Sequence, residues 1–122
     1  MNFRLVSTLA GLVTLPFALS FIFFPETAAT MYGINSWTPG TVAVGRLFGV
    51  ALLFLTMIAL TIRDLVDPQM QRRLAIVHCA ACIITAIVSA HAVTSGATNA
   101  LMWSSVALYA FFVMAWGNLI RR

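Results

Sequence analysis

The stretch LAIVHCAACIITAIVSAHAV, residues 74–93, runs through twenty positions without an Asp, Glu, Lys or Arg. The hydrocarbon core of a bilayer is about 30 Å thick, and an α-helix needs about 20 predominantly apolar residues to cross it. The stretch therefore predicts a membrane-spanning helix. The sequence before and after this stretch shows how many more spans the chain contains.

Three further apolar runs of similar length occur in the chain, and the composition indicates that lipid is their solvent. Hydrophobic residues make up 61% of the 122 and charged residues only 8%, whereas an ordinary soluble domain is about 25% charged. A soluble fold this apolar could not cover its core with polar surface. We therefore predict a single all-α domain, an integral membrane four-helix bundle. Its helices are expected at about residues 3–24, 41–62, 74–93 and 100–120.

Local signals mark the connections between the predicted helices. Pro16 predicts a kink within the first helix, and Pro25 predicts its end. The segment TAATMYG, residues 27–33, predicts a short interfacial helix closed by Gly33. Asn99 is a candidate N-cap for the last helix, because its side chain can accept a backbone N–H of the first turn.

Arginine supplies all seven basic residues and is distributed very unevenly along the chain. Six arginines share one side of a four-span topology, and the two loops on the other side contain none. The six are Arg4, Arg63, Arg72, Arg73, Arg121 and Arg122. Because basic residues near membrane spans stay cytoplasmic, we predict an up-down-up-down bundle in a bacterial inner membrane, with both termini cytoplasmic. Nucleic acid is not expected as a partner despite a pI near 10.1, because most arginines occupy helix ends, where a membrane protein requires them.

Small residues at helical spacing predict how the helices pack, because close backbone approach replaces the hydrophobic effect between helices in lipid. Gly11 belongs to such a stripe on the first helix, and GRLFG places Gly45 and Gly49 in a G-x-x-x-G pair on the second. The third helix carries a polar stripe at spacings of four, three and four residues. It consists of His78, Cys82, Thr85 and Ser89. We interpret these stripes as the interior of a compact bundle.

The segment HCAAC, residues 78–82, suggests metal or redox chemistry that the rest of the chain does not support. A structural zinc site takes four ligands, and the chain has neither a third cysteine nor another histidine nearby. Haem ligation by His78 and His91 is not expected either, because about 100° per residue turns the two rings to different faces. We predict no metal, no cofactor and no catalytic residue. Cys79 and Cys82 are interpreted as packing residues, and His78 as hydrogen-bonded to a neighbouring helix.

Arg46 lies inside the second apolar run, about five residues from its outer end, and so roughly 7 Å below the interface at about 1.5 Å per residue. Two interpretations stay open. The side chain can snorkel to the interface, or it can point inward, toward Glu26 and His91 in the same outer third of the membrane. An inward Arg46 would form an ion pair with Glu26, or would hold an anionic group such as a lipid headgroup or a carboxylate.

The order of FFPETAATMYGI (residues 23–34), VGRLFGVALLFL (residues 44–55) and an Arg- and Asp-rich loop resembles the small bacterial four-helix membrane proteins grouped as DoxX-like. The residues that carry this resemblance are Pro25, Tyr32, Gly33, Arg46 and Gly49. The resemblance implies a left-handed four-helix bundle in the inner membrane. It implies little about chemistry, because many of these families have no known function, although some relatives by fold bind hydrophobic ligands or assist other membrane proteins.

The favoured functional hypothesis is a non-enzymatic accessory or binding module for a membrane-protein partner, a second copy of the chain or a lipid-like ligand. One alternative is a subunit of an oligomeric small-molecule transporter or channel, with a polar cavity. That cavity would be lined by Thr56, Thr85, Ser89 and Ser105. Another alternative is a membrane enzyme that acts on a lipid or a quinone, with His78 or His91 as acid or base.

Overall fold

Long apolar helices dominate the structure, a computed structural model that describes residues 2–121. Within that range the helices are α1 Phe3–Phe23, α2 Pro25–Met31, α3 Pro39–Ile62, α4 Pro68–Thr94 and α5 Met102–Ile120. Four of them, α1, α3, α4 and α5, are long and apolar enough to cross a bilayer. This confirms the predicted all-α class and the four candidate spans. Arg122, one of the six arginines counted on the cytoplasmic side, lies outside the described residues.

Helix α4 begins at Pro68, although the apolar run alone predicts a start near residue 74. The side chain of Asp67 accepts the backbone N–H of Gln69 at 2.9 Å, which caps the helix. Pro68 suits the first helical position, because its fixed φ is helical and it has no N–H to satisfy. The polar segment that includes Arg72 therefore continues the helix beyond the apolar run.

Asn99, just before α5, ties the α4–α5 loop to the end of α2. Its backbone N–H donates to the carbonyl of Tyr32 at 2.8 Å, and its side-chain amide donates to the carbonyl of Met31 at 2.8 Å. Gly33 permits this approach, because its φ is +84° and a Cβ there would lie 3.2 Å from Asn99. The Asn99 side-chain oxygen also accepts the N–H of Leu101 at 3.0 Å, in the turn that leads into α5. The N-cap of α5 is Leu101, without a side-chain cap, so the prediction of Asn99 as the N-cap is wrong.

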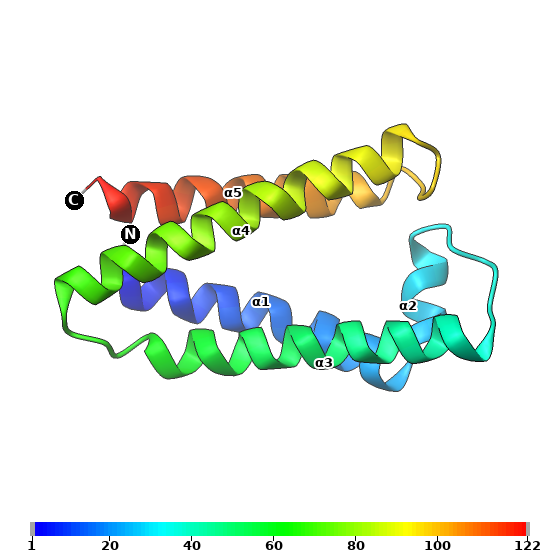
Figure 1. Cartoon of the computed structure of the whole chain (residues 1–122), viewed down its shortest axis with the longest axis horizontal. Helices are drawn as coiled ribbons and strands as arrows, with labels where there is room; N and C mark the ends of the chain where they lie inside the picture. The colour runs from blue at the N-terminus through cyan, green and yellow to red at the C-terminus, as the bar shows by residue number, and fades with distance from the viewer. Residues whose placement is uncertain (1, 122) are drawn as a thin grey trace.

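The four long helices form two antiparallel pairs, α1 with α3 and α4 with α5 (Figure 1). Glycines allow the first pair to approach closely. A Cβ on Gly49 would lie 2.7 Å from the backbone nitrogen of Ile22 and 2.9 Å from the carbonyl oxygen of Ala18. A Cβ on Gly11 would lie 2.7 Å from the Leu60 side chain. The two backbones are therefore as close as the small residues allow.

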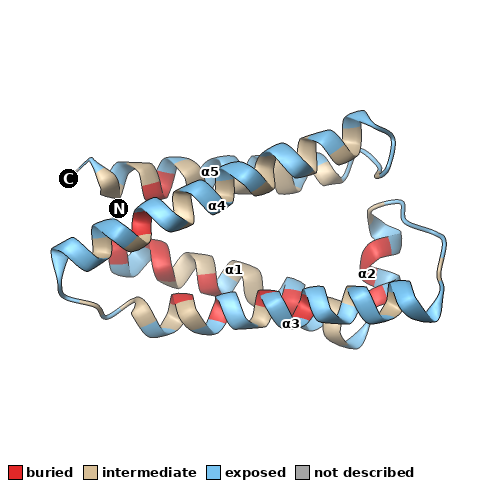
Figure 2. Ribbon diagram, in the orientation of Figure 1, coloured by how far each residue is buried: buried red, intermediate tan, exposed pale blue. Residues whose placement is uncertain are grey.

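The two pairs meet at one end of the molecule (Figure 1). The start of α1, the end of α5 and the α3–α4 loop all lie at this end, which we call the terminal end. Trp116 of α5 is at the centre of this contact and is 1% exposed. Its ring meets the edge of Phe3 at 5.8 Å between centroids and stacks on His78 at 4.7 Å. Val6 and Ala75 are fully buried beside it. Figure 2 shows buried segments of α1, α4 and α5 coming together at this end.

Away from the terminal end the two pairs diverge (Figure 1). Helix α4, all of which is described, buries Ala75 and no other residue, and Phe17 in the second half of α1 is exposed. The molecule therefore consists of two pairs joined at the terminal end and by Asn99, and it is less compact than the expected bundle. Helix α4 packs along α5 and contacts the first pair mainly at the terminal end, where Ala75 is buried.

A hydrogen bond links α1 to α3 in the middle of the first pair and gives a testable prediction. The hydroxyls of Thr14 and Thr56 lie 2.7 Å apart, and Thr56 is 2% exposed. We expect Thr56→Val to lower the free energy of unfolding in mixed micelles by about 1 kcal/mol, the scale measured for hydrogen bonds between membrane helices. Thr61→Val is the matched control, because the Thr61 hydroxyl is exposed and bonds the carbonyl of Met57 in its own helix. Equal losses in the two variants would contradict an interhelical contribution.

Candidate functional site

A groove with a volume of about 200 Å³ lies where α2 joins α1 and α3. We call it the Arg46 groove, and its lining includes Phe23, Phe24, Pro25, Glu26, Val42 and Arg46. Pro25, which is buried, begins α2 and lies against α3 at Gly45, where a Cβ would lie 3.1 Å from the proline ring. The small residue at position 45 therefore lets the start of α2 lie close to α3, one residue from Arg46.

Arg46 and Glu26 bring opposite charges to the Arg46 groove from two different helices, α3 and α2. Among residues 2–121 the salt bridges are Arg4–Asp64 at 3.1 Å and Arg63–Asp64 at 3.3 Å, so the expected Arg46–Glu26 ion pair is not formed. Both side chains are exposed. The groove is therefore lined by a cation and an anion that do not form a salt bridge with each other.

His91, the third residue expected near Arg46, lies in the last turn of α4 and does not line the groove. Its side chain is exposed. His91 and Arg46 were expected to be close because both lie in the outer third of the membrane. Helix α4 pairs with α5 and diverges from the first pair, so His91 does not reach the groove. The sequence could not reveal this, because depth in the membrane says nothing about which helices are neighbours.

The predicted polar stripe of α4 is half-buried along its whole length: His78, Cys82, Thr85 and Ser89. The His78 ring nitrogen Nδ1 lies 2.8 Å from the carbonyl oxygen of Leu74, one turn earlier in the same helix, and not beside a group of a neighbouring helix as predicted. The face of this ring stacks on Trp116. Spacing along α4 alone could not reveal that contact, because it does not show which side chain of α5 lies opposite His78.

The side chains expected to line a transport cavity are divided between the two pairs. Thr56 faces Thr14 within the α1–α3 pair, whereas Thr85 and Ser89 lie on α4 and Ser105 lies on α5. Throughout the described part of the chain, no three His, Cys, Asp or Glu side chains gather where they could hold one metal ion.

No protein-family model, no curated protein and no solved structure matches this chain. The resemblance to DoxX-like proteins is therefore not supported, and the chain is assigned to no family. Its four long apolar helices show a small multi-pass membrane protein in contact with the lipid bilayer.

Proposed function

We propose that this chain is a non-enzymatic binding module of a bacterial inner membrane, with both termini cytoplasmic, and that it holds a lipid-like ligand at the Arg46 groove. The single observation that supports this proposal is that Arg46 and Glu26 line one groove without forming a salt bridge. The orientation follows from the one-sided arginines.

The two charges of the groove favour a zwitterionic headgroup. A purely anionic group near Arg46 is repelled by Glu26, and a purely cationic group near Glu26 is repelled by Arg46. A headgroup with a phosphate and an ammonium satisfies both side chains at once. Guanidinium–phosphate and carboxylate–ammonium contacts are charge-assisted hydrogen bonds, which are about twice as strong as neutral ones.

The size and the rim of the groove fit a headgroup whose acyl chains lie outside. Its volume of about 200 Å³ is smaller than the about 300–1,000 Å³ of pockets that enclose a whole small molecule. Phe23 and Phe24 at the rim are 65% and 67% exposed, so they offer apolar surface to lipid tails beside the polar site. The ligand that fits best is a zwitterionic phospholipid such as phosphatidylethanolamine.

The test is a lipid titration of the detergent-solubilised protein, followed by native mass spectrometry. We expect the part of the binding that depends on Arg46 to be tighter for phosphatidylethanolamine than for phosphatidylglycerol. We expect Arg46→Gln to weaken phosphatidylethanolamine binding about tenfold, which corresponds to the loss of about 1.4 kcal/mol from one charge-assisted contact. Arg121→Gln removes an equal charge at the terminal end and should leave this binding unchanged. Unaltered binding in Arg46→Gln would show that Arg46 only snorkels and would end the proposal.

Glu26→Gln gives the second arm of this test, because it changes selectivity in a stated direction. Without the carboxylate the groove is purely cationic, so the preference should move from phosphatidylethanolamine toward phosphatidylglycerol. The same titration measures the ratio of the two affinities. If the affinity ratio of the two lipids stays the same, or shifts further toward phosphatidylethanolamine, Glu26 is not the partner of the ammonium group.

A further inference from the structure

A second and larger pocket, with a volume of about 490 Å³, lies at the terminal end, opposite the Arg46 groove. The starts of α1 and α4 and the end of α5 enclose it. Its lining includes Asn2, Phe3, Pro68, Gln69, Arg72 and Leu119. We call it the Arg72 pocket. Its volume falls within the range of about 300–1,000 Å³ that is typical of ligand sites.

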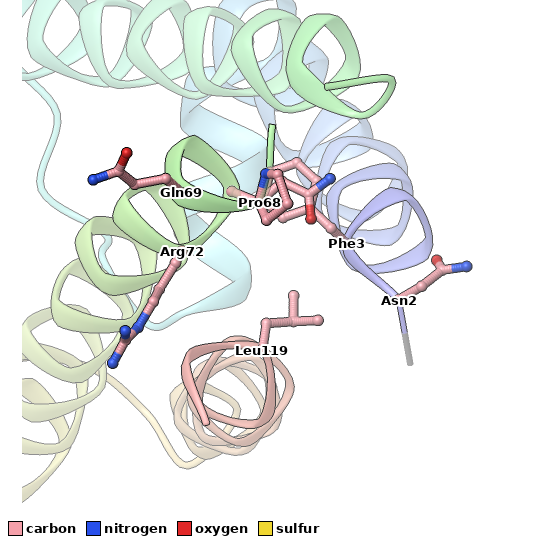
Figure 3. Close-up of a pocket in the computed structure, with 7 residues that line it drawn as sticks. Asn2, Phe3, Pro68, Gln69, Arg72 and Leu119 are labelled. Carbon is pink, nitrogen blue, oxygen red and sulfur yellow. The ribbon is translucent and has the colours of Figure 1, made fainter. Parts of the chain in front are cut away.

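The floor of the Arg72 pocket is apolar and its rim is polar. Figure 3 shows Leu119 reaching from α5 toward Phe3 and Pro68, whereas Gln69 and Asn2 point outward at the rim. Phe3 is held rigidly, because it is buried against Trp116. An apolar floor beneath a polar rim suits an amphipathic molecule, because its polar head can bind at the rim and its apolar part can contact the floor.

The acidic groups near this pocket are already engaged, and its arginine is not. The carboxylate of Asp64 forms salt bridges with Arg4 and Arg63, and that of Asp67 caps α4. Within residues 2–121, Arg72 forms no salt bridge. The pocket is therefore lined by a cationic side chain that is not held in a salt bridge within residues 2–121.

We propose that the Arg72 pocket binds the headgroup phosphate of an anionic phospholipid. The Arg72 guanidinium, which Figure 3 shows descending from α4 on the side of α5, supplies planar donors for the phosphate oxygens. The Gln69 amide at the rim reaches a glycerol-type headgroup. Phe3 and Leu119 contact the glycerol backbone. Ile76, one helical turn beyond Arg72 and exposed on α4, continues the apolar path for an acyl chain.

The two sites differ in charge, and this decides which lipid each takes. The Arg46 groove contains Glu26, whereas no acidic residue of the described chain lines the Arg72 pocket. A zwitterionic head would leave its ammonium without a partner here, so the pocket selects a net anionic head. Basic pockets between membrane helices on the cytoplasmic side bind such lipids, and the one-sided arginines place the terminal end on that side.

Neighbouring arginines on α4 allow a matched test. Arg73 has the same charge as Arg72 and the next position in the helix, but it does not line the pocket. In native mass spectrometry with phosphatidylglycerol, we expect Arg72→Gln to weaken binding about tenfold, the loss of one charge-assisted contact, and Arg73→Gln to change it less than about twofold. Equal losses in the two variants would show that only the general basic charge of this end attracts the lipid, and would overturn the proposal.

A second variant tests the apolar half of the site without removing charge. Leu119→Trp fills the floor and should weaken phosphatidylglycerol binding in a protein whose helicity by circular dichroism is unchanged. Inorganic phosphate and glycerol 3-phosphate at millimolar concentration should not displace the lipid, because they lack the acyl chains. Displacement by either, or full binding in Leu119→Trp, would contradict a lipid site. Arg46→Gln should leave this binding intact, so failure of the proposed function and failure of this inference are distinguishable.

Discussion

Gly49→Val is expected to separate α1 from α3 and to lower the free energy of unfolding by about 3 kcal/mol or more, the upper range for overpacked sites. The Cβ of any larger residue would lie 2.7 Å from the backbone nitrogen of Ile22 and 2.9 Å from the carbonyl oxygen of Ala18. Both obstacles are backbone atoms, which no side-chain rotation can remove, so the helices have to move apart. The Thr14–Thr56 hydrogen bond two turns away would lengthen with them. Reversible unfolding in mixed micelles measures the loss.

Gly117→Ala is the matched control for this prediction. Gly117 lies inside α5, and a Cβ there would have nothing within 4 Å. Because alanine is a better helix former than glycine, we expect this variant to be more stable than the wild type by about 0.5–1 kcal/mol. A lower free energy of unfolding in Gly49→Val and a higher one in Gly117→Ala would confirm that the close approach of α1 and α3 requires glycine at residue 49. A loss at residue 117 as large as the loss at residue 49 would refute it.

Trp116→Ala is expected to cost about 3–5 kcal/mol, the range for truncating a buried tryptophan to alanine. Trp116 contacts Phe3 on α1 and His78 on α4 from its own position on α5, so a cavity at this point weakens the contact between the two pairs and not one pair alone. We expect the distance between spin labels at positions 8 and 118, measured in a cysteine-free background, to become longer and more broadly distributed.

Trp103→Ala tests whether position or residue type causes that loss. Trp103 is also on α5 but is 47% exposed, and it lies near the start of the helix, far from the terminal end. Its truncation should cost less than about 1 kcal/mol, as is usual for exposed positions, and should leave the label distance unchanged. A comparable effect at both tryptophans would argue against a specific junction at Trp116.

The sequence was sufficient to predict the four long helices, because the length and hydropathy of a segment are local properties. It was less informative about their ends. Thr38 and Asp67 cap α3 and α4 before the apolar runs begin, so capping residues followed by proline would have placed both starts correctly. Asn99 was predicted as the N-cap of the last helix by the same reasoning, but the N-cap of α5 is Leu101. The hydrogen bonds of Asn99 to Met31 and Tyr32 depend on the tertiary fold.

The arrangement of the helices and the details of the candidate site required coordinates. The stacking of Trp116 on His78 depends on the crossing of α4 and α5, which no spacing rule specifies. The sequence placed Glu26 and Arg46 at the same depth, and both do line one groove. Whether they form a contact depends on where α2 directs its first turn, and that is set by Pro25 lying against Gly45.

The division into two pairs implies an order of events during synthesis. A chain is made from its N-terminus, so α1 and α3 can dock inside the bilayer while α4 is still within the ribosome. The contact that unites the halves needs Trp116 and must wait until α5 has been inserted. Until then the nascent chain exposes Phe3 and Val6 to the translocation machinery or to lipid, and a chaperone of the insertion pathway would find its substrate at that stage.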